Sequence, residues 1–153
     1  MRQKVINLLN EARSSELTAI NQYMIHYYEL EDKDFGKLAS KIKDIAIAEM
    51  KHAEKLAERI LFLKGEPTSK PDATPKKEQE ILKMLATDMT LEAQAVKMYN
   101  EAAFLCASER DQKSKDLFEE LLSDEEKHLN FFENIKNHME KLGEAYLATL
   151  TGK

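Results

Sequence analysis

The 153-residue sequence contains little cysteine, glycine or proline and no tryptophan. Its single cysteine, Cys106, excludes an internal disulfide and any metal site built from cysteine alone. Four glycines and three prolines are too few for a loop-rich chain, and 42% hydrophobic residues are too many for a disordered one. No apolar run approaches the roughly 20 residues that span a bilayer, and the first residues lack an apolar secretory core. We therefore expect a helical, globular, cytoplasmic protein without a membrane segment.

The charge balance is slightly acidic. The chain has 23 Lys and Arg against 28 Asp and Glu, which gives a formal net charge of −5 at pH 7. Proteins that bind nucleic acid need basic surfaces, so no nucleic acid partner is expected. Small cations are favoured as partners instead.

The scarce glycines and prolines divide the chain into five predicted helices. The breaks are marked by Gly36, Gly65, Pro67, Pro71, Pro75 and Gly143. We expect Asp34 to cap the second helix, Gly65 to end it, and Thr74–Pro75 to begin the third. The predicted helices span about residues 2–32, 35–64, 75–107, 111–141 and 144–151 of a single domain, 1–153.

Each long predicted helix carries an apolar stripe with spacings of three and four residues, which is typical of one buried face. Four such helices predict an all-α four-helix bundle, to which the short fifth helix is appended. The stretch from Gly65 to Thr74 is longer than the roughly 2–8 residues that usually join neighbouring helices. We therefore expect two antiparallel helical hairpins joined by a long crossover along the side of the bundle.

Six ionisable residues interrupt the apolar stripes. They are Glu16, Glu49, His52, Glu92, Glu125 and His128. Two Glu-x-x-His motifs, at 49–52 and 125–128, each place a carboxylate and an imidazole on one helix face. In each half of the chain a lone glutamate precedes the motif by the same 33 residues. The spacing predicts a duplicated hairpin that brings all six side chains to one level of the bundle.

Four buried carboxylates need counter-charge, because burying an unpaired ion costs several kcal/mol. Two divalent cations would neutralise four glutamates, and two neutral histidines would complete the ligand set. Oxygen-rich ligands with one imidazole for each metal suit iron or manganese, and iron is the first choice. The alternative is two buried Glu–His pairs held by ordinary hydrogen bonds. The metal interpretation is favoured because all six residues share both the core phase and the repeat.

Two tyrosines follow the same repeat. Tyr23 and Tyr99 each lie seven residues after a lone glutamate. Tyr23 is a candidate to hydrogen-bond a ligand glutamate and to donate an electron during oxygen reduction. The alternative for both is a core aromatic ring with a satisfied hydroxyl.

Four other residues have simpler expectations. Asp88, on the buried stripe, is expected either to orient a ligand histidine or to form a buried salt bridge. Cys106 is expected to be a small core residue. His26 and His138 belong to no motif and are expected at the surface.

The segments that contain these residues resemble bacterioferritin, within the ferritin-like di-iron superfamily, over nearly the whole chain. The similar segments are residues 16–23, 49–54, 58–63 and 124–128. The resemblance implies iron storage and detoxification by a ferroxidase that oxidises Fe(II) to Fe(III) with O2 or H2O2 at a di-iron centre in each subunit. It also implies a homo-oligomer, a hollow shell of about 24 subunits built from twofold dimers, and a small ferredoxin for iron release.

The resemblance also assigns roles to individual residues. It implies terminal metal ligands at Glu16 and Glu92, bridging ligands at Glu49 and Glu125, and imidazole ligands at His52 and His128. Met50 matches the axial ligand of a haem b that two subunits share. The sequence departs from the family at Asp44 and Ala48, which stand where a histidine and an aspartate can bind iron on the inner surface. Passage of iron from the centre through that inner site is therefore not implied.

Two other classes of function stay open. One is a non-storage di-iron or di-manganese peroxidase or catalase of the rubrerythrin type. A rubrerythrin usually adds a module with paired cysteines, which the single cysteine forbids. The other is a metal-free interaction bundle, whose melting temperature would not change on chelation.

Overall fold

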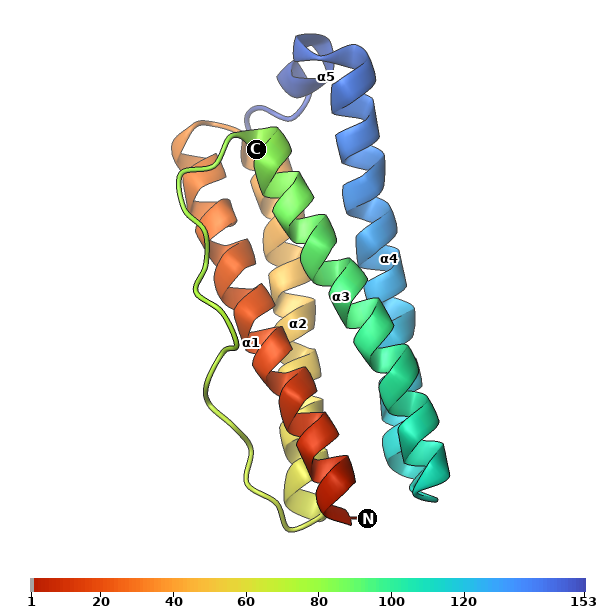
Figure 1. The fold of residues 1–153 in the computed structure, drawn as a ribbon. Coiled ribbons are helices and arrows are strands. Elements are labelled where there is room, and N and C mark those ends of the chain that lie inside the picture. The colour runs from red at the N-terminus through yellow and green to blue at the C-terminus, as the bar shows by residue number, and fades with distance from the viewer. Residues whose placement is uncertain (1) are drawn as a thin grey trace.

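The computed structural model describes residues 2–153, and these residues form five helices (Figure 1). The helices are α1 (Arg2–Asp32), α2 (Gly36–Phe62), α3 (Ile81–Ser108), α4 (Gln112–Leu142) and α5 (Glu144–Ala148). Helix α1 packs along α2 and α3 packs along α4, and the two hairpins meet through α1 against α3 and α2 against α4. The predicted four-helix bundle with a short fifth helix is confirmed. None of the helices in residues 2–153 has the apolar length that a membrane span requires.

The crossover between α2 and α3 runs along the outside of α1 in an irregular, extended path (Figure 1). Polar side chains of α1 hold its backbone. The Asn10 amide donates to the Glu66 carbonyl at 3.0 Å and accepts from the Thr68 N–H at 2.8 Å. The Gln22 amide donates to the Lys76 carbonyl and accepts from the Lys76 N–H, both at 2.8 Å. These bonds satisfy backbone groups that have no helix or sheet partner.

Helix α3 begins later than predicted, at Ile81 rather than near residue 75, and Thr74–Pro75 does not cap it. The preceding backbone is bound to α1 instead. The Lys76 backbone bonds a glutamine of α1, and the Glu78 N–H donates to Glu29 at 2.7 Å. Glu78 also adopts a left-handed φ of 57°, which is incompatible with a continuous helix. The tertiary contacts therefore override the local capping signal.

Three helices end at a residue in the left-handed region that is not glycine. Asp34, Lys64 and Arg110 have φ values of 65°, 68° and 60°. At each end the next N–H donates at 2.9 Å to the carbonyl five residues earlier, as in a Schellman motif. Asp34 therefore ends α1 and does not cap α2, whose N-cap residue Phe35 makes no side-chain cap bond. Gly65 follows the left-handed residue, and packing requires it, since an added Cβ would lie 2.8 Å from a side chain of α1.

The C-terminal tail packs against the turn between α1 and α2. The Gly152 N–H donates to the Asp34 carbonyl at 2.8 Å. A Cβ at Gly36 would lie 1.9 Å from the Gly152 carbonyl oxygen, so only glycine allows this close approach. Helix α5 itself is shorter than predicted and ends at Ala148.

Two apolar clusters fill the bundle, one toward each end. The first includes Leu9, Leu56, Tyr99 and Phe118, and the second includes Tyr23, Leu38, Leu85 and Phe132. In each long helix, the buried residues of one cluster give way to those of the other at the predicted ligand positions. The buried glutamates therefore occupy a polar layer between two apolar layers.

Asp111 caps α4 and supports a test of the fold. Its carboxylate accepts from the Ser114 N–H at 3.0 Å and from the Arg59 guanidinium at 2.8 Å. We expect Asp111→Ala to lower the free energy of unfolding by about 1–2 kcal/mol at pH 7, the usual cost of a lost N-cap. Urea unfolding measures this loss. The control is Asp116→Ala, which removes an exposed aspartate of α4 and should change the free energy of unfolding by less than about 0.5 kcal/mol.

The effect of Asp111→Ala should depend on pH. Burial raises the pKa of Asp111, but bonds from Ser114 and Arg59 outweigh it and bring the pKa below its usual 3.8. A lowered folded-state pKa stabilises the protein above the unfolded-state pKa, and that stability is lost as pH falls through the folded-state value. The difference between wild type and Asp111→Ala should therefore be constant from pH 7 to about 5 and shrink below that. A difference that grows as the pH falls would contradict this assignment.

Candidate metal centre

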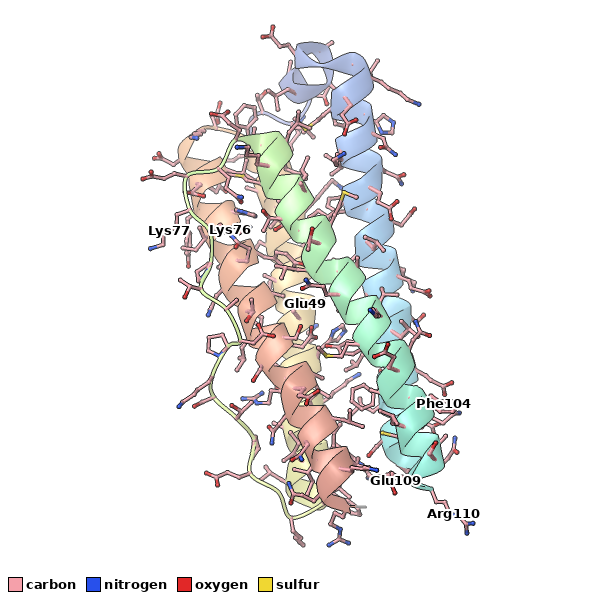
Figure 2. The ribbon with its side chains drawn as sticks, in the orientation of Figure 1. Glu49, Lys76, Lys77, Phe104, Glu109 and Arg110 are labelled. Carbon is pink, nitrogen blue, oxygen red and sulfur yellow. The ribbon has the colours of Figure 1, made fainter. Side chains whose placement is uncertain are left out.

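The structure brings the six predicted side chains together in the middle of the bundle. They come from all four long helices: Glu16 from α1, Glu49 and His52 from α2, Glu92 from α3, and Glu125 and His128 from α4. The four glutamates are buried, with at most 1% of each residue exposed. Figure 2 places Glu49 near the centre of the bundle, between the two hairpins.

The six side chains form two overlapping groups. One group is Glu16, Glu49, His52 and Glu125, and the other is Glu49, Glu92, Glu125 and His128. Within each group, one ligand atom from every residue lies within 4.8 Å of the others. Glu49 and Glu125 belong to both groups, so their carboxylates lie between two adjacent positions. This arrangement suits two cations that share two bridging carboxylates.

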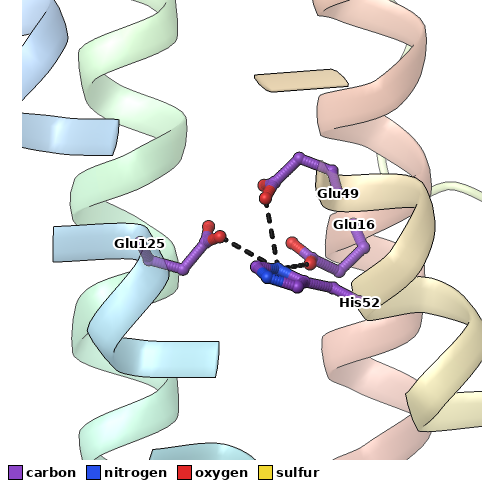
Figure 3. Close-up of side chains that lie close together, drawn as sticks. All are labelled: Glu16, Glu49, His52 and Glu125. Atoms are coloured by element: carbon purple, nitrogen blue, oxygen red, sulfur yellow. Dashed lines mark hydrogen bonds and ion pairs between the residues drawn. The ribbon is translucent and has the colours of Figure 1, made fainter. Parts of the chain in front are cut away.

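Three carboxylates converge on one nitrogen in the first group (Figure 3). The Nδ1 atom of His52 lies 2.7 Å from Glu16 Oε2, 3.1 Å from Glu125 Oε1 and 3.2 Å from Glu49 Oε1. An imidazole nitrogen carries at most one proton, so it cannot satisfy three carboxylates at once. A cation in this position would have three oxygens and one nitrogen around it.

The second group is looser. The Nδ1 atom of His128 lies 3.4 Å from Glu49 Oε1, 3.5 Å from Glu125 Oε1 and 3.6 Å from Glu92 Oε1. These contacts lie beyond the usual hydrogen-bond distance, and His128 Nδ1 is buried without a hydrogen-bond partner.

Many polar atoms of the cluster lack partners. Both carboxylate oxygens of Glu49 and of Glu125, and one oxygen of Glu92, are buried without a hydrogen bond. Unpaired buried polar atoms are rare and costly in folded proteins. Here they face one another, so the donor set fits divalent cations that accept oxygen and imidazole nitrogen.

Burial and mutual repulsion shift the pKa values of the cluster. Burial, with the Glu125 carboxylate nearby, raises the pKa of Glu16 to about 7. Burial also raises the pKa of Glu49 well above its usual value. Although burial lowers the pKa of His128, the carboxylates of Glu125 and the other glutamates close to its ring raise it to about 12. Without a cation, the cluster therefore holds protons in place of metal charge.

Asp124 completes the environment of His52. The Nε2 atom of His52 lies 2.9 Å from Asp124 Oδ2, on the side of the ring away from the glutamates. Because the Asp124 carboxylate accepts a hydrogen bond from Nε2–H, the proton of the neutral imidazole stays on Nε2 and the Nδ1 lone pair is directed at the cluster. The sequence pattern indicates Asp88 as a candidate for this orienting role and does not single out Asp124. The available signal was the position of Asp124 immediately before a predicted ligand.

His26 is buried, so its predicted surface position is wrong. Its Nδ1 atom lies 3.0 Å from Asp88 Oδ2, and its Nε2 atom lies 3.0 Å from Gln79 Oε1. Although burial favours the neutral imidazole, the bond to Asp88 raises the pKa of His26. Asp88 therefore forms the buried salt bridge, one of its two predicted roles, and does not orient a predicted ligand. His138 is exposed as predicted.

The two tyrosines of the repeat differ. The Tyr23 hydroxyl donates to Glu92 Oε1 at 2.6 Å, so the predicted contact with a candidate ligand is present. The Tyr99 hydroxyl is buried without a hydrogen-bond partner. The two halves of the site are therefore not identical around the carboxylates.

The remaining candidate residues lie away from the cluster. Met50 is 41% exposed on the outer face of α2, next to the core residue Glu49. Asp44 is exposed and Ala48 is half-buried on the same helix. Cys106 is buried as predicted, and burial raises the pKa of its thiol to about 11.

The sequence is similar to known proteins over nearly its whole length. A family profile described as a ferritin-like domain matches residues 6–142. The chain is 41% identical over 149 residues to a bacterioferritin of Desulfovibrio desulfuricans, which covers 97% of this chain and 83% of that protein. It is 40% identical over 147 residues to a bacterioferritin of Rhodobacter capsulatus, which covers 96% of this chain and 91% of that protein.

Solved structures of bacterioferritins from the same two species have similar folds. The D. desulfuricans bacterioferritin, described with its di-iron site in different catalytic states, has a TM-score of 0.97 at 40% identity and covers 99% of this chain and 89% of its own. The R. capsulatus bacterioferritin, described with a metal-free dinuclear site and a haem iron, has a TM-score of 0.93 at 40% identity and covers 99% of this chain and 94% of its own.

The buried pair of His26 and Asp88 supports a second test. We expect Asp88→Leu to destabilise the metal-free protein by about 3–5 kcal/mol, because it leaves His26 buried without its counter-charge. The double variant His26→Leu/Asp88→Leu should lose less, since no unpaired charge remains. Urea unfolding of both variants measures the difference. A double variant that loses at least as much as Asp88→Leu would show that the pair is not coupled.

Proposed function

The chain belongs to the bacterioferritin family, and we propose on that premise that it oxidises Fe(II) to Fe(III) at the centre described above and stores the ferric mineral. The observation that carries the proposal is the pair of overlapping ligand groups that share Glu49 and Glu125. Two adjacent positions with common carboxylates suit a reaction in which two Fe(II) ions each give up one electron. Iron is here the substrate and the stored cargo.

Each of the six residues has a role in this proposal. Glu16 and Glu92 would each bind one iron ion, and Glu49 and Glu125 would bridge both. His52 and His128 would each supply one imidazole nitrogen. The cluster with two Fe(II) ions is neutral, because two divalent cations balance four carboxylates.

The chemistry balances with either oxidant. Two Fe(II) ions supply two electrons, which reduce H2O2 with two protons to two waters, or O2 with two protons to H2O2. Oxidation adds two positive charges that four carboxylates cannot cancel, so bound oxide or hydroxide, or loss of iron from the site, would have to balance them. Tyr23, hydrogen-bonded to Glu92, is placed to supply a further electron through its phenol.

The storage part of the proposal requires an assembled shell. Several large apolar side chains are exposed on the chain, among them Tyr28, Leu61, Phe62, Phe104 and Leu105. Phe104 projects from the outer surface of α3 (Figure 2). Contacts between copies of the chain would bury such side chains and so stabilise an assembly. We propose a homo-oligomeric shell of about 24 copies built from twofold dimers, with a small ferredoxin as the electron donor for iron release. The predicted cytoplasmic location stays a prediction.

Met50 is the candidate haem ligand in this assembly. Met50 is 41% exposed and Ile47, on the same helix, is 37% exposed. A partner chain could approach this face and bring a second Met50 to the same group. A haem b held there would supply a route for electrons between the outside of the shell and the stored iron.

The first test of the function is Fe(II) titration of metal-free protein in air, with Glu49→Ala as the variant. Wild type should oxidise iron rapidly up to two Fe(II) for each chain, and then take up much more iron slowly in the soluble fraction. Glu49→Ala removes a carboxylate common to both groups. We expect its rapid phase to fall by at least about 100-fold, as for loss of a group that holds the reacting ions.

Glu58→Ala is the matched control, because Glu58 is an exposed glutamate of the same helix. Its rapid phase should equal that of wild type. Unchanged oxidation in Glu49→Ala would reject the site. Rapid oxidation with later iron precipitating outside the protein, together with sustained peroxide turnover, would favour the non-storage di-iron or di-manganese enzyme. A melting temperature unaffected by chelation would favour the metal-free bundle, since a bound metal stabilises the fold by mass action.

The haem assignment has its own test. We expect Met50→Leu to lose the absorption of bound haem while the rapid iron oxidation stays unchanged, because Met50 points away from the cluster. The spectrum of reconstituted protein measures haem, and the iron titration measures oxidation. Full haem binding by Met50→Leu would contradict the assignment of Met50 and leave the di-iron site unaffected.

A further inference from the structure

The internal repeat is broken beside the metal centre. Residues of the first hairpin correspond to those 76 positions later, which pairs Glu49 with Glu125. The same step pairs Ala48 with Asp124. The carboxylate that bonds one histidine of the site thus has only a methyl group as its counterpart in the other half.

The two histidines consequently differ in their surroundings. The Nε2 atom of His52 lies 2.9 Å from Asp124 Oδ2. Every ion pair that His128 makes within residues 2–153 uses its Nδ1 atom. The His128 side chain is 14% exposed, whereas that of His52 is 4% exposed. His52 is therefore bonded at both ring nitrogens, and His128 is not.

This difference affects how each ring can bind a metal. A neutral imidazole binds metal through the nitrogen that carries no proton. Asp124 accepts a hydrogen bond from His52 Nε2–H, so it selects the tautomer with a free Nδ1 lone pair and fixes the ring orientation. His128 must select the same tautomer and orientation without this bond. Metal binding at His128 therefore has the larger ordering cost.

We propose that Asp124 is a positioning residue that makes the two metal positions unequal, with the His52 position tight and the His128 position weaker and the first to empty. The inference rests on the proposed function, because it concerns the same two positions. Loss of a carboxylate that supports a ligand histidine typically lowers metal affinity by about 10–100-fold. The two positions should differ by a similar factor.

The experiment uses Co(II) as a probe that resists oxidation, with the full-length assembled protein after removal of iron. Anaerobic calorimetry and visible absorption should detect two Co(II) for each wild-type chain, in two steps that differ about 10–100-fold in affinity. Asp124→Ala should weaken the tighter step by that factor and bring the two steps together. Ala48→Asp should tighten the weaker step by about 10-fold or more, because it gives His128 a similar carboxylate.

Glu120→Ala is the matched control. Glu120 is an exposed carboxylate one turn before Asp124 and pairs with Lys55, so its removal changes the local charge without touching His52. Both steps should stay as in wild type, and the Co(II) absorption bands should change only in the variants at 124 and 48.

The outcomes separate the two proposals. Two equal steps in wild type, or equal weakening of both steps by Asp124→Ala, would overturn the unequal positions and leave the di-iron site intact. If Asp124→Ala does not assemble, Ala48→Asp decides, and an unchanged weaker step in that variant overturns the inference. No Co(II) binding by wild type would reject the proposed function, and the inference with it.

Discussion

Repulsion among four buried carboxylates is the constraint on which the rest of this structure depends. Glu16, Glu49, Glu92 and Glu125 lie at one level of the bundle, and two imidazoles are the only basic side chains in the two ligand groups. Each uncompensated buried charge costs several kcal/mol, while a whole domain is stable by only about 5–15 kcal/mol. The apolar clusters above and below the layer must hold the bundle together when protons are the only counter-charge. Cations remove the repulsion, so the same layer that destabilises the empty protein strengthens the loaded one.

The sequence predicts much of this arrangement because helical periodicity and the repeat act together. The apolar stripes fix which face of each helix is buried, and the 33-residue spacing fixes the level of the glutamates. Both signals are local or periodic, so they can be read along the chain. The crossover is longer than the loops that usually join neighbouring helices, so its length likewise indicates that it runs along the side of the bundle.

The errors arise where contacts between distant segments decide the structure. The start of α3 moves to Ile81 because polar side chains of α1 hold the preceding backbone. His26 is buried because its partner Asp88 lies 62 residues later, on another helix, and no spacing along the chain reports such a pair. Asp34 takes a left-handed conformation that its capping propensity does not predict. Asp124 reaches His52 across the interface between the hairpins, which periodicity alone does not reveal.

The two halves of the repeat match at the candidate metal ligands and differ in the residues around them. The 76-residue repeat pairs His26 with Ala102 and Asp88 with Ala12, and both alanines are also buried. One half of the bundle thus has a salt bridge where the other has two methyl groups. A second difference of the same kind separates Asp124 from Ala48. The candidate ligands are therefore nearly symmetric, while the side chains around them are not.

The division of the ligands between the hairpins also bears on synthesis of the chain. Each hairpin is formed by helices adjacent in sequence, and such local contacts form early in folding. Each ligand group, however, includes side chains from both hairpins. A nascent chain that has emerged only through the crossover contains α1 and α2 but neither complete group. Domains begin to fold from the N-terminus during synthesis, so iron binding at the complete centre must wait until α4 has emerged and packed against the other helices. Incomplete chains on the ribosome therefore carry no complete iron-oxidising centre.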